Sequence, residues 1–483
     1  MRAIASLESA PHLDRAGNPV QAMLHGSSFR VALFVLAHIP LAVIMSRSAT
    51  ISTAHALGVL LFGFVWGLRK QAPERVAFVA AYITGSEVLW RMTECGVFWE
   101  YAKYATSFLL VAWMAITGSF RRTLVPLFYL LLLVPSISLT LSSSDPLLAK
   151  RMISFNLSGP LSLAVCVMFF GQLEMTRAQL HRLLITLIAP ILGISTLAFL
   201  GTATADDLLF TKNSNFETSG GYGPNQVSAI LGLAALLVFL LLSVQRHRAG
   251  AQILLVLGVV GFTAQAALTF SRGGVYNCVA AALVGAAFLM RGGQQRGRIV
   301  IMSVLVTILA YYILFPRLDA FSGGQLAKRF EDTQTSGRDA IMRDDLAIWD
   351  RNLILGVGPG MSRLNRITLQ SAIVAHTEFS RLAAEHGIFG LLAAVVLVAL
   401  GLVRLAQAPT GWRQALPATL VAWSFIYMLH AAMRLVAPSL MLGLAMATLL
   451  DDKPRSLLRR AERPGLGPHQ EPPRPPLRRE LGA

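Results

Sequence analysis

Apolar runs of about 18 or more residues recur along most of the chain, separated by short polar stretches. A helix of that length crosses the hydrocarbon core of a bilayer. The pattern predicts fourteen spans, at residues 29–46, 51–68, 75–92, 102–119, 124–141, 159–173, 183–200, 226–244, 252–270, 275–290, 299–315, 386–403, 416–432 and 435–450. The third and sixth are the weakest, which leaves twelve or thirteen as alternatives. The expected fold class is therefore an all-α polytopic membrane protein with 12–14 transmembrane helices.

The longest polar interruption in this pattern is the segment 316–385. Inside it, residues 338–349 repeat apolar side chains at helical spacing and predict an amphipathic helix suited to a membrane interface. Its apolar face is expected to hold Ile341, Met342, Leu346, Ile348 and Trp349. A glycine-rich turn over 356–360 ends this helix. His376 then introduces a further helix that becomes a transmembrane span at about Gly387.

The positive charge of the chain sets the expected orientation. The 483 residues have a net charge of +17, 54% are hydrophobic and the mean hydropathy is +0.59. With a cytoplasmic N-terminus, short inner loops hold 14 Lys and Arg residues against 8 in short outer loops. This excess favours two cytoplasmic termini and an extracytoplasmic segment 316–385. In a membrane protein such a charge does not imply nucleic-acid binding.

The expected organisation has five parts. Residues 1–28 form a cytoplasmic tail without the apolar core of a signal peptide, and 29–315 hold the first eleven spans. Residues 316–385 form the outer loop, and 386–450 hold the last three spans. Residues 451–483 are rich in Pro and Arg, and are expected to be a disordered basic tail near anionic lipid.

Neither a disulfide framework nor a metal site is predicted. Three cysteines stand singly, at 95, 166 and 278. The acidic pairs Asp206–Asp207 and Asp344–Asp345 have no third ligand at suitable spacing, so we interpret them as solvated faces. The first outer loop, 47–50, contains no acid that could hold a metal. We therefore expect a protein without metal or other cofactor.

Several polar groups fall on the predicted outer side. Arg272 lies in the tight turn TFSRGG between two spans, where an arginine has little room to reach water. It is either a structural residue that binds helix-end carbonyls or an anion ligand. Arg434 follows His430 at another span boundary. Asn225 and Gln226 open a span after Pro224, either as an ordinary helix start or as amides that face a sugar.

His376 is the candidate general base. A histidine at a helix start is often only a cap, but a neutral imidazole can accept a proton from a hydroxyl near pH 7. His430 and His55 are weaker rivals on the same side. Glu378 or Glu385 could replace it only if burial raised the carboxyl pKa, whereas nearby arginines would lower that pKa.

Four motifs resemble the O-antigen ligase and O-antigen polymerase superfamily of bacterial membrane glycosyltransferases. They are GPNQVS at 223–228, SRGG at 271–274, GRDAIMRDDLAIWDRNLILGVGPG at 337–360 and AHTEFSRLAAEHGIFGLL at 375–392. The resemblance covers residues 200–400 by motif and the rest by hydropathy. Thr377 follows the histidine where family members often have Asn, which leaves the histidine's role intact.

The resemblance implies a membrane glycosyltransferase of the GT-C type in the bacterial inner membrane. The donor would be a glycan on undecaprenyl diphosphate, and the acceptor a glycan or lipid A-core hydroxyl at the periplasmic face. Transfer would be inverting and independent of metal. Arg272 and Arg338 would bind the diphosphate, with Arg434 added from the predicted topology, and His376 would act as base.

Some alternatives stay open at this stage. The motifs fit ligases and polymerases alike, although GPNQVS favours a polymerase slightly. Proteins that set polysaccharide chain length or export could be partners. A transporter for lipid-linked glycans would need charges spread through the bilayer depth, whereas here they gather on one side. A non-catalytic scaffold that docks a partner on the outer loop is the other alternative.

Overall fold

The structure is a computed structural model. It describes residues 27–68, 72–122, 124–205, 208–211, 213–244, 249–291, 296–332, 334, 337–366 and 375–450. The predicted tails 1–28 and 451–483 therefore lie outside the described residues, apart from the first two helical positions, 27 and 28. The predicted acidic pair Asp206–Asp207 lies outside them as well.

The described chain is almost entirely helical, which confirms the all-α polytopic fold class. Ten of its helical segments are long and apolar enough to cross a membrane. The helices are α2 Ser27–Leu36, α3 His38–Ser46, α4 Ala49–Phe62, α5 Pro73–Met92, α6 Tyr101–Thr117, α7 Val125–Leu133, α8 Ile137–Ser143, α9 Pro146–Phe170, α10 Arg177–Thr204, α11 Pro224–Val244, α12 Ala249–Leu268, α13 Arg272–Arg291, α14 Arg296–Ile308, α15 Phe315–Phe321, α16 Gln325–Glu331, α17 Arg338–Arg351, α18 Glu378–Gln407, α19 Trp412–Ala431 and α20 Ala437–Met446. Short π-helical turns, Gly63–Gly67 and Leu309–Leu314, extend α4 and join α14 to α15.

Four predicted spans coincide with helices outside those ten: α5, α6, α19 and α20. Helix α5 carries Glu87 and Arg91, α6 has 17 residues, and α20 has only 10. Their side chains are largely buried, with α5 packed against α10 and α20 packed against α9. A helix that is enclosed by other helices does not need a fully apolar surface, because protein rather than lipid surrounds it.

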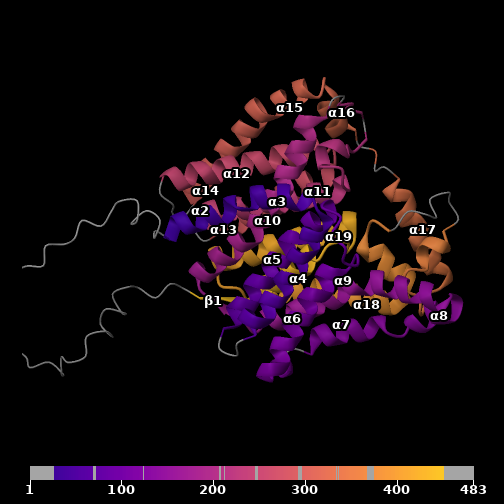
Figure 1. Ribbon diagram of the computed structural model, residues 1–483. Helices are drawn as coiled ribbons and strands as arrows, with labels where there is room; N and C mark the ends of the chain where they lie inside the picture. Colours follow the sequence, from indigo (N-terminus) through magenta and orange to yellow (C-terminus); the bar gives the residue numbers. More distant parts are fainter. Residues whose placement is uncertain are drawn as a thin grey trace, which may run out of the picture.

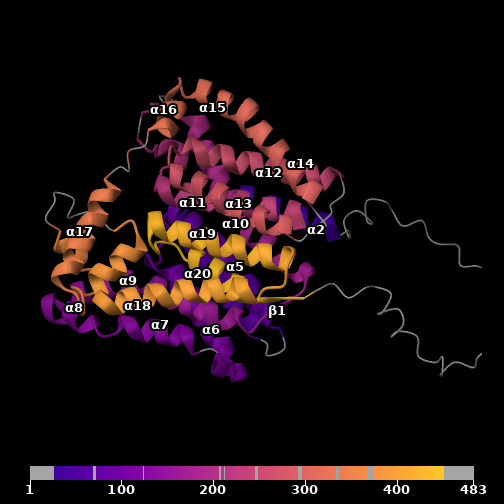
Figure 2. The same cartoon turned by 180° about the vertical axis from the view of Figure 1, so that it is seen from behind.

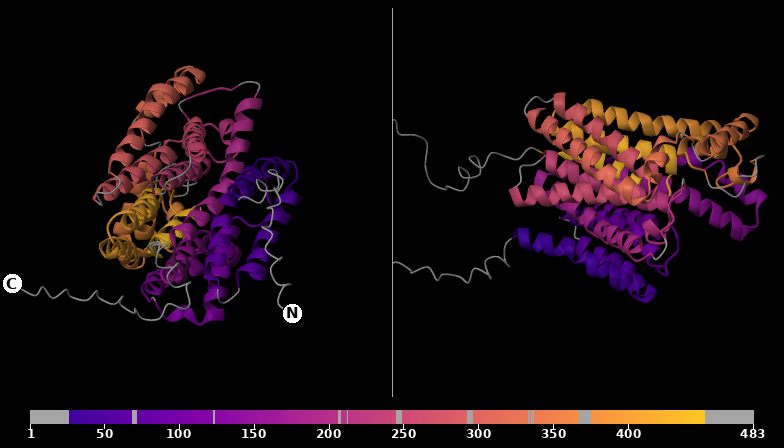
Figure 3. Two further views of the ribbon diagram at one scale, coloured as in Figure 1. Left: turned by 90° about the vertical axis from the view of Figure 1, so that its left-hand side faces the viewer. Right: turned by 90° about the horizontal axis from the view of Figure 1, so that it is seen from above.

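The long helices run side by side along one common direction (Figure 3). Helix α2 begins at the same end of the bundle as the short parallel strands β1 (Glu174–Met175) and β2 (Thr448–Leu449), and α17 lies at the opposite end (Figures 1 and 2). The two ends of the described membrane domain thus share one end of the bundle. Helix α17 lies at the other end.

Helix α17 forms where the amphipathic pattern predicts it, but a different face is buried. Ile341, Asp345 and Ile348 are buried on the side that packs against α18, whereas Met342 and Leu346 are exposed. The interpretation of Asp345 as part of a solvated face is wrong. Its carboxylate is buried because it accepts hydrogen bonds from the side chains of Arg366 and Ser380.

The glycine-rich turn after α17 fits closely between helices. Gly360 has a φ of +81°, and a Cβ atom there would lie 2.7 Å from Met152 Cβ on α9. Gly387 interrupts α18 with a φ of +61°, and its Cβ would lie 2.4 Å from the carbonyl oxygen of Ile354. Both positions need glycine for backbone conformation and for space. The break at Gly387 is where the sequence predicts the start of the apolar span.

Candidate active site

The predicted site residues come from separate elements that meet at the α17 end of the bundle. Arg272 begins α13, Arg338 begins α17, His376 precedes α18, and Arg434 lies in the connection between α19 and α20. The Ala432 amide donates to the carbonyl oxygen of His376 at 2.9 Å. Arg434 Nη2 donates to the carbonyl oxygen of Ala375 at 3.3 Å. These two contacts hold the His376 segment against the α19–α20 connection.

The SRGG motif brings α13 into the same region. A Cβ atom on Gly273 would lie 2.9 Å from the ring of His430, and one on Gly274 would lie 2.1 Å from the Ser228 carbonyl oxygen. Glycine is required at both places because a side chain would push α13 away from α11 and α19. The motif thus serves close packing next to Arg272.

Four arginines form what we call the cationic cluster: Arg272, Arg329, Arg338 and Arg434. The Arg338 side chain has no hydrogen bond or ion pair to any described residue, and its pKa is lowered by burial and then by the charges of the other three arginines. Burial and the charge of Arg272 likewise lower the pKa of Arg329, which has one ion pair at 3.8 Å to Asp332. A concentration of positive charge with so little compensation is suited to an anion.

Arg272 has the first of the two roles that the sequence left open, the binding of backbone carbonyls. Its Nη1 and Nη2 atoms donate to the carbonyl oxygens of Arg329 at 3.4 Å and Gln334 at 2.6 Å. These bonds tie α13 to the chain that follows α16. A guanidinium has five N–H donors in a planar fork, so donors remain for a ligand.

His376 is largely buried within this field. Its pKa is lowered to about 3, first by burial and then by the positive charges of Arg434, Arg338 and Arg366. A hydrogen bond to the backbone of His430 acts in the opposite direction. The Nδ1 atom is buried and has no hydrogen-bond partner. The imidazole is therefore neutral at pH 7.

The predicted amides lie beside the cationic cluster, but their oxygens are occupied. Ser271 Oγ donates to Asn225 Oδ1 at 2.7 Å. Arg91 Nη1 donates to Gln226 Oε1 at 2.6 Å. The two amides therefore fix the start of α11 to its neighbours.

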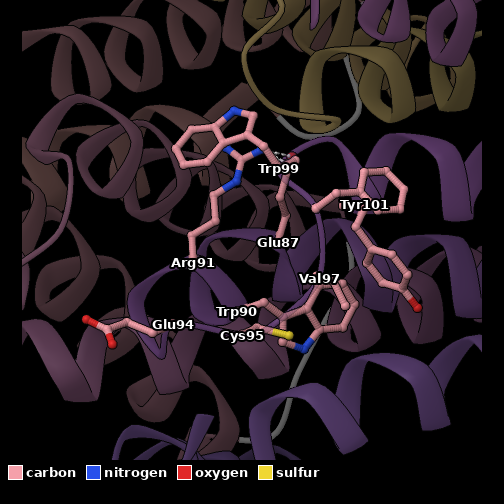
Figure 4. A pocket seen from close by; sticks show the side chains of 10 residues that line it. Glu87, Trp90, Arg91, Glu94, Cys95, Val97, Trp99 and Tyr101 are labelled. Carbon is pink, nitrogen blue, oxygen red and sulfur yellow. Dashed lines mark hydrogen bonds and ion pairs between the residues drawn. The ribbon is translucent and has the colours of Figure 1, made fainter. Parts of the chain in front are cut away.

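Arg91 is a member of the site that the sequence analysis did not single out. It forms an ion pair with Glu87 at 2.7 Å and donates to the carbonyl oxygen of Arg434 from 3.4 Å and 3.5 Å. Its guanidinium lies over the Trp99 ring, 4.3 Å from the centroid (Figure 4). The spacing of Glu87 and Arg91, one helical turn apart in an otherwise apolar span, is the signal that could have revealed the pair.

Backbone strain also gathers around this region. Among the described residues, three non-glycine residues have positive φ: Glu94 at 50°, Phe270 at 57° and Ala432 at 49°. Glu94 lines the same pocket as Arg91, Phe270 directly precedes the SRGG motif, and Ala432 lies two residues before Arg434. Conformations of this kind persist only where surrounding contacts enforce them, and they cluster at functional sites.

The rival bases have other partners in the structure. Glu378 and Glu385 both form ion pairs with Arg381, and Glu378 also accepts from the Met433 amide at 3.2 Å. His55 accepts from Trp90 Nε1 at 2.9 Å and bonds to the Tyr82 hydroxyl at 3.0 Å. His430 remains next to the site, packed edge to face on Tyr427. Its Nε2 atom is buried without a hydrogen-bond partner.

No grouping of three or more His, Cys, Asp or Glu side chains suited to a metal occurs in the part of the chain that the structure describes. Asp345, one member of the acidic pair considered above, forms an ion pair with Arg366 at 2.9 Å.

These features define a multi-pass membrane protein with a strongly cationic, histidine-containing site at one end of its helical bundle. Residues 264–395 match the family model described as O-antigen ligase. The match confirms the resemblance to the O-antigen ligase and polymerase superfamily, and it spans Arg272, Arg338 and His376. It supports an enzyme of the glycosyltransferase kind. No curated protein matches the chain.

Proposed function

We propose that the protein transfers a glycan from undecaprenyl diphosphate to an acceptor hydroxyl at the periplasmic face of the bacterial inner membrane. The observation that carries the proposal is the neutral, buried His376 beside an arginine cluster with little internal compensation. The family match gives the general class of reaction. The donor, the acceptor and the side of the membrane belong to the proposal.

In the proposed reaction the cationic cluster binds the donor diphosphate. Arg272 and Arg338 present planar forks that can donate two parallel hydrogen bonds to phosphate oxygens, and Arg434 adds charge. The acceptor oxygen attacks the anomeric carbon from the face opposite the diphosphate, which inverts the configuration there. The bond between that carbon and the phosphate oxygen breaks, and its electron pair leaves with the diphosphate. The arginines stabilise the charge that develops, so we propose that no metal is needed.

His376 would take the proton of the acceptor hydroxyl. The Nδ1 atom has no hydrogen-bond partner, so we assign the proton-accepting lone pair to it. With a pKa of about 3, the imidazole is a weak base in the unliganded protein. A bound diphosphate would offset the arginine charges and raise that pKa, making the base stronger when the donor is present.

The choice between polymerase and ligase depends on the acceptor. We favour a polymerase slightly, on the GPNQVS motif at 223–228. A bacterial strain from which this protein has been deleted tests this choice. Single unpolymerised repeats on the surface would indicate a polymerase, and loss of lipopolysaccharide capping with intact long polymer on the carrier would indicate a ligase.

The transfer itself can be tested with purified protein in lipid vesicles that contain the lipid-linked glycan. We expect elongated or transferred glycan in the presence of EDTA. Loss of product with EDTA and recovery with magnesium would contradict the metal-independent mechanism. Absence of transfer to either acceptor would contradict the enzyme proposal itself.

A further inference from the structure

A cavity lies beside the His376 segment, since Ala375 is among the residues that line it. Its volume is 410 Å³, and we call it the α9 cavity because Arg151 and Asn156 of α9 form one wall. Arg363, Ala375 and Arg381 of α18 also line it. Helices α9 and α18 lie close together at the α17 end of the bundle (Figure 2). The volume falls within the range of about 300–1,000 Å³ that is usual for small-molecule sites.

The arginines that line the α9 cavity fall into two kinds. Arg381 is neutralised by Glu378 and Glu385 and also donates to Asn156. The side chains of Arg151 and Arg363, in contrast, form no ion pair or hydrogen bond to any described residue. Two such arginines on separate elements that line one cavity can bind one anionic group between them.

The other polar groups of the cavity lining suit a sugar. The amide of Asn156 and the hydroxyl of Ser362 lie among the lining groups, together with the carboxylate of Glu100. Such groups can donate to and accept from the hydroxyls of a carbohydrate. A ligand that combines sugar hydroxyls with a phosphate would use both parts of the lining.

The cavity also reaches the reaction centre. Ala375, which lines it, directly precedes His376 and accepts the hydrogen bond from Arg434. A smaller space of 20 Å³ shares Asn156 and Arg381 with the cavity and extends to Arg434 in the cationic cluster. The α9 cavity and the smaller space beside Arg434 therefore adjoin each other.

We infer that the α9 cavity is the acceptor subsite, and that Arg151 and Arg363 bind an anionic group on the acceptor lipid. The inference rests on the proposed function, because it divides the same reaction between two sites. The donor diphosphate occupies the cationic cluster, the acceptor occupies the α9 cavity, and the acceptor hydroxyl reaches His376 between them. The shared chemistry is a glycan on a phosphate-bearing lipid, which fits both lipid A-core and a polyprenyl-diphosphate repeat.

The test uses the full-length protein in vesicles, with donor held at saturation and acceptor varied. Lipid A-core and a lipid-labelled polyprenyl-diphosphate repeat form the two arms. The double variant Arg151→Ala/Arg363→Ala should raise the acceptor KM about tenfold or more in one arm, because charge-assisted hydrogen bonds are lost. The KM for donor and kcat should change little. The charge reversal Arg363→Glu should raise the acceptor KM further.

Arg343→Ala is the matched control, because Arg343 is 70% exposed on α17 and its ion pair with Asp339 lies at the surface. Its kinetics should match those of the original protein. An unchanged acceptor KM in both arms for the double variant would overturn the acceptor subsite while leaving the transfer reaction intact. A fall in kcat without a change in acceptor KM would overturn it as well. If the original protein transfers glycan to neither acceptor, the proposed function itself fails.

Discussion

Arg91 Nη1 donates to Gln226 Oε1 at 2.6 Å, and this bond joins the end of α5 to the start of α11. The same guanidinium binds Glu87 and the carbonyl oxygen of Arg434, so it connects three regions of the chain around the site. Glu87 Oε2 accepts from the Val436 amide at 2.7 Å, which fixes the start of α20. The Glu87–Arg91 pair therefore holds the α19–α20 connection in place.

Removing Arg91 should destabilise the protein strongly. Arg91→Met leaves the carboxylate of Glu87 buried without its cation, and breaking a buried pair in this way costs about 3–5 kcal/mol. Thermal unfolding in detergent would measure the loss as a lower Tm. The double variant Glu87→Gln/Arg91→Met removes both charges and should be more stable than Arg91→Met alone. A double variant as unstable as the single one would show that the charge imbalance is not the cause.

His376→Ala should reduce turnover by about 10²–10⁴-fold, because general-base assistance typically contributes that much. Donor binding should be nearly unchanged, since the diphosphate is assigned to the arginines. Single-turnover kinetics with the lipid-linked donor would separate the two effects. If the variant retains more than about a tenth of the original turnover, His376 is structural. His430 would then be the next residue to test.

Replacing Arg272 or Arg338 with Lys should impair transfer even though the charge is kept. A lysine ammonium cannot reproduce the two-pronged contact of a guanidinium with phosphate. We expect a loss of about tenfold or more for each, in line with the strength of charge-assisted hydrogen bonds. Arg343→Lys, at an exposed position of α17, serves as control. Unchanged turnover in both site variants would refute their role.

The pH dependence should differ between the free and the donor-bound protein. The pKa of His376 is lowered to about 3 by burial and neighbouring arginines, so the imidazole of the free protein stays neutral as pH falls from 8 to about 5. The value of kcat/KM reports the ionisation of the free enzyme. Protonation of His376 should therefore not lower kcat/KM over that pH range. Bound diphosphate raises the pKa, so kcat should begin to fall at a higher pH than kcat/KM. Coincident acid limbs would argue against coupling between diphosphate and His376.

The predicted topology places residues 294 and 335 on opposite sides of the membrane. Helices α13 and α14 flank the first position, and α17 follows the second at the other end of the bundle (Figure 1). Tags inserted at Gln294 and Thr335 should therefore be accessible from opposite sides in intact cells. Accessibility of both tags from one side would refute the orientation.

The sequence by itself determined the membrane class, the helical segments and the resemblance to the O-antigen ligase and polymerase superfamily. Hydrophobic patterning is a local property, because a helix in a bilayer satisfies its own backbone hydrogen bonds. The spans therefore follow from the chain without knowledge of their neighbours, and even the break at Gly387 coincides with the onset of apolar residues. The motifs around Arg272, Arg338 and His376 were recognisable for a similar reason, since each is contiguous in the chain.

Only the tertiary structure decided which polar groups are occupied and which remain available. Asp345 and Glu385 resemble other acidic residues in the sequence, yet both are buried in ion pairs. Asp345 pairs with Arg366, which is distant along the chain, and Glu385 pairs with Arg381, one helical turn away. Arg338 and Arg91 are both arginines at helix ends. The Arg338 side chain has no hydrogen bond to a described residue. The Arg91 side chain, in contrast, binds Glu87, Gln226 and the carbonyl oxygen of Arg434. The difference arises from long-range packing, which brings donors and acceptors together regardless of their separation in the sequence.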